Sequence, residues 1–150
     1  MNNRPQASLV NRILTPSVFL LAGIAALVWF SYRLYVLLYN ADAAVILVDK
    51  GSYYMLGVGL GLLDLALVII WEQWLLRSLN RKSTAIFSRV AIGSVVLLLA
   101  VPQAIHYWAD RQLTAKGYSV CEAASHQWLF VQDIVYIQAL TECSKNLIAK

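Results

Sequence analysis

The sequence contains few charged residues. Only 13% of its 150 residues are Asp, Glu, Lys or Arg, whereas 60% are hydrophobic. An average soluble domain has about 25% charged residues and about 45–50% apolar residues. Because a small domain has a high ratio of surface to volume, half the usual charge cannot solvate its surface. The composition therefore excludes an ordinary soluble enzyme and a disordered regulator, and it indicates a protein of the lipid bilayer.

A continuous basic surface is also missing. Twelve Lys and Arg residues against eight Asp and Glu give a formal net charge of +4, but the longest basic cluster is only Arg77, Arg81 and Lys82. Nucleic-acid binding needs a basic stripe or an aromatic platform on a soluble face. A basic excess is instead typical of small membrane proteins, whose cytoplasmic loops collect Lys and Arg. We therefore expect no nucleic-acid partner.

Motifs for catalysis or cofactor binding are absent from the sequence. It has no Gly-x-Ser-x-Gly turn, and it contains only two histidines. His126, Glu122, Asp133 and Cys121 follow no spacing that is typical of an active site. The two cysteines form neither a CxxC redox motif nor part of a zinc-ligand cluster. We therefore expect no enzyme activity, no metal ion and no cofactor.

Three apolar runs are long enough to cross a bilayer, and we predict transmembrane helices over residues 18–39, 53–76 and 90–108. About 20 helical residues cross the roughly 30 Å hydrocarbon core, because each residue rises about 1.5 Å. We expect an all-α membrane protein with a three-helix transmembrane bundle in residues 1–109 and a tail in residues 110–150. The aromatic residues near the predicted helix ends, typical of an interfacial belt, are Tyr53, Tyr54, Trp71, Trp74, Tyr107 and Trp108.

The basic residues predict the orientation of these helices. With the N-terminus inside, the cytoplasmic side holds Arg4, Arg12, Arg77, Arg81, Lys82 and Arg89. The opposite side then holds, close to the membrane, Lys50, Arg111 and Lys116. Because cytoplasmic loops collect Lys and Arg, we expect the N-terminus inside and the C-terminal tail outside. The first run is longer than a signal-peptide core and no small-x-small cleavage site follows it, so we expect it to remain as a membrane anchor.

The C-terminal tail is more polar than the three runs, and residues 128–140 are too short and too polar to span a membrane. Within them Trp128, Val131, Ile134 and Val135 recur at helical spacing, which predicts a short amphipathic helix. Such a helix would lie on the membrane surface or cover the outer mouth of the bundle.

Both cysteines, Cys121 and Cys143, lie in this tail. An outer tail is in an oxidising compartment, which predicts a disulfide bond between them. In the chain-entropy model a loop of this length contributes about 3 kcal/mol of stability. A tail of about 40 residues needs that contribution, because it has too little core of its own. The alternative is two free, buried thiols in a cytoplasmic tail.

Asp64 lies near the middle of the second apolar run, where a carboxylate costs about 2.5–3.5 kcal/mol. We expect it to face the interior of the bundle and find either a proton or a partner, with Arg33 as the first candidate and Gln103 and His106 as alternatives. Two interpretations follow. Asp64 is either a proton or ion carrier, or these four residues form a structural polar network between the helices. We favour the network, because a transport path normally needs several polar residues along it.

Two small-residue features predict local helix geometry. Gly57 and Gly61 form a GxxxG pair, which allows another helix to approach closely, either from this chain or from a second copy in a homo-oligomer. Pro102 removes a backbone donor and should kink the third helix or end it early. A kink beside Gln103 and His106 is either a plain irregularity or the wall of a shallow polar recognition pocket.

The overall layout resembles a known type of protein. The tail residues that carry the resemblance are Gly117, Tyr118, Cys121, Trp128, Tyr136 and Cys143. With a few helices before such a tail, the chain is similar to small bacterial inner-membrane proteins with a cysteine-bearing periplasmic tail. Several of these lie beside secreted antibacterial toxins and act as immunity proteins. The resemblance implies a multi-pass inner-membrane protein that binds a cognate toxin at or in the membrane.

Binding of a protein partner would need anchors on the chain. The aromatic residues Trp128, Phe130 and Tyr136 of the tail are the candidates outside the membrane. Within the bilayer, closely packed helices with a buried charge could pair with helices of the toxin. Two other functions stay open, namely an accessory subunit of a larger membrane complex and a small transporter or proton conduit that uses Asp64.

Overall fold

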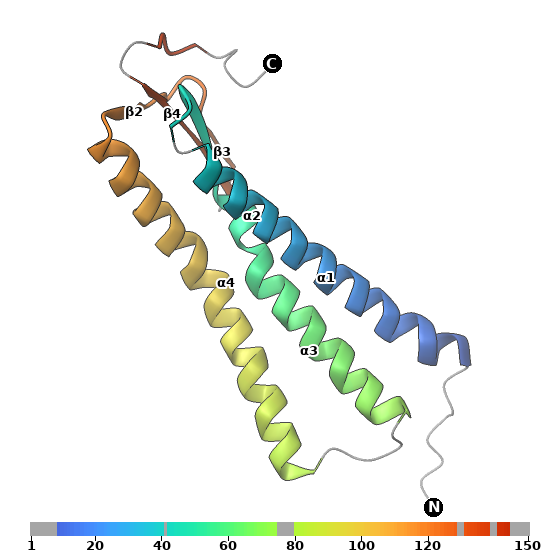
Figure 1. Cartoon of the computed structure of the whole chain (residues 1–150). Helices are drawn as coiled ribbons and strands as arrows, with labels where there is room; N and C mark the ends of the chain where they lie inside the picture. The colour runs from blue at the N-terminus through green and yellow to red at the C-terminus, as the bar shows by residue number, and fades with distance from the viewer. Residues whose placement is uncertain (1–8, 41, 75–79, 129–130, 139–140, 145–150) are drawn as a thin grey trace, which may run out of the picture.

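The computed structural model describes residues 9–40, 42–74, 80–128, 131–138 and 141–144. Long helices run side by side, and short strands from distant parts of the chain gather across one end of them (Figure 1). In chain order, the described elements are α1 (Leu9–Tyr39), β1 (Val45–Asp49), α2 (Lys50–Tyr53), α3 (Met55–Trp74), α4 (Arg81–Ala115), β2 (Tyr118–Val120), β3 (His126–Trp128) and β4 (Val131–Gln138). We call the end with the strands the sheet end, and the opposite end, where α3 ends and α4 begins, the loop end.

The prediction of three membrane-length apolar helices is confirmed. In the described part of the chain the candidate spans are Arg12–Tyr39, Lys50–Gln73 and Arg81–Ala115. In each of them, at most 22% of an apolar stretch of 18 residues is buried within the protein. The side chains that remain exposed on them are largely apolar, as contact with lipid tails requires. The 35 residues of α4 rise about 52 Å, well beyond the roughly 30 Å hydrocarbon core. α4 is therefore long enough for its last turns to reach the sheet.

α1 and α4 extend beyond the predicted apolar runs, and in α4 local signals other than hydropathy set the ends of the helix. The side chain of Asn80 caps α4 by accepting a hydrogen bond from the Ser83 backbone N–H at 2.8 Å. Gly117, with a φ of 83°, ends the helix in the left-handed conformation that favours glycine. Pro102 is buried inside α4, which continues to Ala115, so of the two predicted effects of this proline the early end of the helix does not occur. Residues 75 and 76 of the second predicted segment lie outside the described residues.

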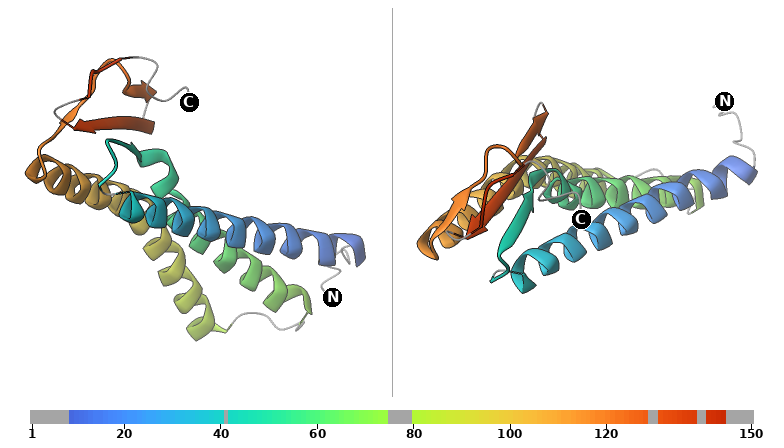
Figure 2. Two further views of the ribbon diagram at one scale, coloured as in Figure 1. Left: turned by 45° about the horizontal axis from the view of Figure 1, so that its top comes forward. Right: turned by 90° about the horizontal axis from the view of Figure 1, so that it is seen from above.

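Glycines bring α3 into close contact with a helix on each side. A Cβ atom at Gly57 would lie 2.4 Å from the Leu98 Cβ of α4. On the other side, one at Gly59 would lie 3.0 Å from the carbonyl oxygen of Gly23 in α1. Gly61 faces α4 as well, 3.2 Å from the Ser94 Oγ on the same measure. The close partner of the predicted GxxxG pair is thus α4 of the same chain, and α3 lies between α1 and α4 (Figure 2).

The strands form an antiparallel sheet with β4 in a central position. β1 pairs with one edge of β4, so that Val45 lies opposite Ile137 and Asp49 lies opposite Asp133. β2 and β3 both pair with β4 as well, at different points along its length. Because β1 comes from the connection between α1 and α3, the C-terminal tail is joined to the helices by strand pairing (Figure 1).

This sheet overturns two predictions. The chain is not all-α, and residues 128–140 contain no amphipathic helix within the described part, because Val131–Gln138 is a strand. β4 is buried on both faces. Ile134 and Tyr136 pack toward Leu37, Ala109 and other helix residues, whereas Val135 and Ile137 pack against Cys121 and Ala124. A strand covered on both faces shows a continuous apolar run instead of alternation, so its spacing also fitted a helix.

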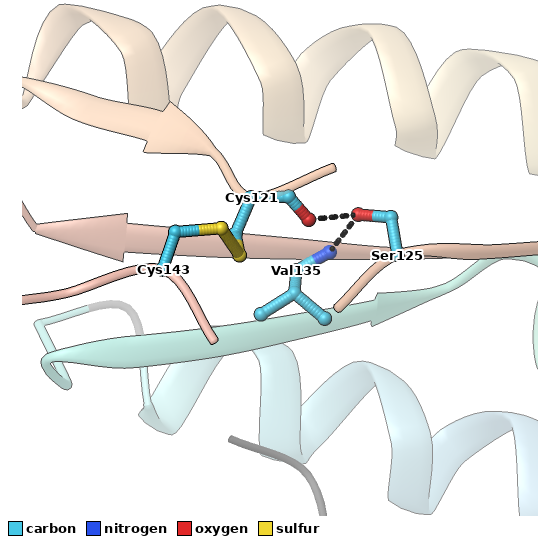
Figure 3. The surroundings of a disulfide bond; sticks show 4 residues. All are labelled: Cys121, Ser125, Val135 and Cys143. Carbon is cyan, nitrogen blue, oxygen red and sulfur yellow. Dashed lines mark hydrogen bonds between the residues drawn. A yellow bond between two sulfur atoms is a disulfide. The ribbon is translucent and has the colours of Figure 1, made fainter. Parts of the chain in front are cut away.

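A disulfide bond closes the face of the sheet that points away from the helices. Cys121 and Cys143 are bonded, with 5.5 Å between their Cα atoms, which confirms the predicted pairing. Beside it, Ser125 Oγ accepts a hydrogen bond from the Val135 N–H at 3.1 Å and donates one to the Cys121 carbonyl at 2.8 Å (Figure 3). The loop between β2 and β3 is therefore tied to β4 by backbone and hydroxyl hydrogen bonds, and to the segment after β4 by the disulfide bond.

Candidate functional site

A polar pocket of about 480 Å³ opens where the sheet-end part of α4 meets the sheet. Its size is within the range of clefts that take a small ligand or a side chain of a partner. The pocket is built by α4, β2, the loop after β2, β3 and β4. Its lining residues are His106, Asp110, Val120, Glu122, Ser125, His126, Gln132, Ile134 and Tyr136.

The floor of the pocket is Tyr136, which is fully buried. Its hydroxyl donates a hydrogen bond to Asp110 Oδ1 at 2.8 Å, which ties β4 to α4. Burial raises the pKa of Tyr136 above its ordinary value of 10.0, and the hydrogen bond to Asp110 raises it further. The phenol therefore stays protonated and holds the Asp110 carboxylate in place.

Two acidic side chains and an unpaired imidazole nitrogen give the pocket its chemistry. Asp110 and Glu122 are exposed at the rim, and neither Lys nor Arg is among the described residues that line the pocket. The Nδ1 atom of His106 is buried without a hydrogen-bond partner in the described part of the chain. A buried polar atom without a partner costs about 1–3 kcal/mol. The pocket is therefore suited to a group that carries positive charge and hydrogen-bond donors.

The Ser125 hydroxyl, which lines the pocket, is already used in two structural hydrogen bonds. Ser125 Oγ donates to the Cys121 carbonyl and accepts from the Val135 N–H, so it is not poised as a nucleophile beside His126. Across the described residues, no group of three or more His, Cys, Asp or Glu side chains is arranged to hold a metal ion.

An acidic pair lies next to the pocket and joins α1 to the sheet. Asp49 and Asp133 face each other across β1 and β4, close enough for Asp49 to raise the pKa of Asp133. Arg33 Nη2 donates to Asp49 Oδ2 at 3.0 Å. Asp49 also accepts bonds from the backbone N–H and the hydroxyl of Ser52. His126, which lines the pocket, lies opposite Asp133 in the pairing of β3 with β4.

We expect Asp133→Asn to make stability less dependent on pH. Burial raises the pKa of Asp133 above 3.8; the charge of Asp49 raises it further, while Arg33 and His126 oppose the shift. The folded state therefore holds this proton more firmly than the unfolded chain, so its stability falls as pH rises from about 4 through the raised pKa. Melting curves of purified protein in detergent between about pH 4 and pH 7 check this.

As the pH rises over that range, the melting temperature of the variant should fall less than that of the wild type. Glu142→Gln, which removes an exposed carboxylate, is the control and should keep the wild-type profile. Identical pH profiles for Asp133→Asn and wild type would contradict a role for this pair.

The structure does not bring the four residues of the predicted polar network together. Arg33 pairs with Asp49 instead of Asp64, and Gln103 accepts a hydrogen bond from Lys50 Nζ at 2.9 Å. His106 lines the pocket near the sheet, and Asp64 lies deeper, in the middle of α3. Arg33 is near the end of α1 and has an acidic partner on the adjacent strand, which hydropathy alone did not indicate.

The predicted partner-binding aromatics have different positions. Tyr136 has no exposed surface, and it is among the residues that line the pocket. Trp128 is the last residue of β3, and Phe130 lies outside the described residues. Asp110 and Gln132 gave no sequence signal, because they join the pocket only through the pairing of distant strands with the end of α4.

No protein-family model matches this chain, and neither a curated protein nor a solved structure matches it.

Proposed function

We propose that this chain is a multi-pass protein of the bacterial inner membrane whose sheet end lies in the periplasm and binds a protein partner. As the purpose of that binding, we propose immunity to an antibacterial toxin that acts at the membrane. The observation that carries the binding function is the acidic pocket between α4 and the sheet. The immunity function rests on the resemblance of the chain's layout to such proteins.

The distribution of charge supports this orientation. The described cations at the loop end include Arg81 and Lys82, which are exposed, as is typical of a cytoplasmic side. At the sheet end the cations Arg33 and Lys116 each pair with an aspartate, Lys50 is bonded to Gln103, and Arg111 is exposed. The disulfide bond also suits an oxidising compartment at the sheet end.

The pocket suggests what the partner supplies. Asp110 and Glu122 can accept charge-assisted hydrogen bonds from a Lys or Arg side chain that enters the pocket. Basic side chains that fill a desolvated pocket commonly carry a large part of the energy of a protein interface. We therefore propose that a basic side chain of the toxin binds between α4 and the loop after β2.

Competition between bacterial strains tests the proposal. A strain without the gene is grown in contact with its wild-type parent, with the neighbouring secretion genes expressed, and survival is counted. We expect selective killing of the deletion strain and protection when the intact gene is returned. The double variant Asp110→Asn, Glu122→Gln should protect about tenfold less well, because it loses both charged acceptors.

The matched control is Glu142→Gln, which changes an exposed acid outside the pocket and should protect like the wild type. All variants are compared at equal abundance in the membrane. Equal survival of deletion strain and parent would refute immunity. Full protection by the double variant would leave immunity standing and refute the pocket as the binding site.

An accessory subunit of a larger membrane complex is the second candidate function. It is favoured by Asp64, a buried carboxylate without a partner in the described part of the chain. A proton conduit receives less support, because Val58, Leu62 and Leu98 line the neighbouring part of the same helix face and leave it largely apolar. Copurification of a stable complex after mild detergent extraction would favour the subunit function over immunity.

A further inference from the structure

Asp64 is a buried acidic residue that the outer pocket does not use. It is the tenth of the 20 residues of α3 and is only 6% exposed. Within the described part of the chain its carboxylate has neither a hydrogen bond nor an ion pair. Acidic side chains at such depth in a membrane protein almost always pair with another group. The fold thus leaves this residue without the partner that its position calls for.

Asp64 lines a groove between α3 and α4. The part beside it has a volume of about 230 Å³ and is formed by Asp64, Val68, Thr84, Phe87, Ser88 and Ala91. Toward the sheet end follows a hollow of about 250 Å³, with Gly57, Gly61 and Ser94 among its lining residues. Gly57 and Gly61 already face α4 closely, so they are not free to receive a further helix. Beside Asp64, however, the small side chains of Thr84, Ser88 and Ala91 on α4 allow the backbone of another transmembrane helix to approach closely. The groove therefore combines a surface for a helix with an unpaired carboxyl group.

The described cations of the chain do not supply the missing charge. Arg33 is bonded to Asp49 near the sheet end, and Arg12 donates to the Gln73 carbonyl at the loop end. Arg89 of α4 is closer in depth, since it lies between Ser88 and Ala91, which both line the groove. However, each helical residue turns about 100°, so Arg89 points away from the groove, and it is exposed.

We propose that the groove between α3 and α4 binds a transmembrane helix of a partner protein that carries a Lys or Arg at the depth of Asp64. The aliphatic stem of such a side chain lies along Val68 and Phe87, and its charged end reaches the carboxylate. Lipid tails cover apolar surface equally well but offer no group that can pair with Asp64. This proposal does not depend on the function of the outer pocket.

Synthetic helices test the proposal directly. The full chain is reconstituted in phosphatidylcholine vesicles with a fluorescent poly-leucine helix that has one Lys at its centre, and association is measured by energy transfer. Because Asp64 is in the middle of α3, a central Lys reaches its depth in either orientation. We expect this helix to bind about tenfold more tightly than the same helix with Leu or Glu at the centre.

Variants of the chain identify the contact. Asp64→Asn should abolish the preference for Lys, and Asp64→Lys should reverse it in favour of the Glu helix. Glu72→Gln, an exposed acid on the same helix, is the control and should bind like the wild type. Ala91→Leu fills the groove without touching the charge, so it should weaken binding even where Asp64 is intact.

Two results would overturn the proposal. One is equal binding of the Lys and Leu helices by the wild-type chain. The other is self-association of the chain that requires both Asp64 and Arg89, because the occupant of the groove would then be a second copy.

Discussion

Gly57→Ala is expected to destabilise the transmembrane helices strongly, although it adds a single methyl group. The new Cβ would lie 2.4 Å from the Cβ of Leu98 and 2.6 Å from the Cα and N atoms of that residue. Backbone atoms of a neighbouring helix cannot rotate away as the end of a flexible side chain can. The two helices must therefore separate, and we expect a loss of about 3 kcal/mol, at the upper end of the usual cost of overpacking.

Gly93→Ala is the matched control for this substitution. Gly93 is also a helical glycine, but a Cβ atom there would meet nothing within 4 Å. Because alanine favours a helix over glycine by about 1 kcal/mol, this control should be neutral or slightly stabilising. The measurement is the melting temperature of both variants in detergent, monitored by near-ultraviolet circular dichroism. Equal melting temperatures for the two variants would contradict the close contact between α3 and α4.

Cys143→Ser should loosen the sheet end and leave the transmembrane helices folded. Cys121 is buried at 1% exposure and belongs to the smaller apolar cluster of the sheet, whereas Cys143 is exposed. Replacing Cys143 removes the crosslink over 22 residues and leaves that cluster intact. The chain-entropy model gives a loss of about 3 kcal/mol for such a loop. The helices keep their own packing through the glycines of α3.

Limited proteolysis checks this expectation. The variant should be cut rapidly between β2 and the C-terminus, while a fragment that contains α1, α3 and α4 persists. Reduction of the wild type should have the same effect, and Ser144→Ala, an exposed neighbour, should not. Thiol labelling of intact cells should find both cysteines unreactive until a reductant is added. Free thiols in intact cells would contradict the proposed periplasmic location of the sheet.

Predictions from the sequence succeeded where the cause was local. Hydropathy over about 20 residues is enough to identify a membrane helix, because the bilayer acts on each segment independently. Two of the three helices extend well past the apolar runs, since the Asn80 cap and Gly117, and not hydropathy, limit α4. The disulfide was also predictable, since the chain has two cysteines and both are in one tail.

Predictions failed where residues far apart in the chain meet. The strand Val131–Gln138 exists because β1, which precedes α3, pairs with it, and no pattern within residues 128–140 records that neighbour. Arg33 was predicted to pair with Asp64, but β1 brings Asp49 to it at 3.0 Å. The nearby aspartate on a strand was missed because the strand itself was not foreseen.

The candidate site divides in the same way. For His106 the sequence left two alternatives beside Pro102, a plain helix irregularity or a polar pocket, whereas Glu122 and His126 fitted no site by spacing. Their common pocket arises only when β2, β3 and β4 pair and close over the end of α4.

The sequence by itself determined the membrane helices, the crosslinked tail and the buried charge at Asp64, because hydropathy, cysteine content and charge are properties of short segments. Only the tertiary structure decided that the tail is a sheet, that Arg33 pairs with Asp49 and that Asp64 is left unpaired in a groove. These features depend on strand pairing and helix contacts between distant segments, so they cannot be predicted from the sequence of any one segment.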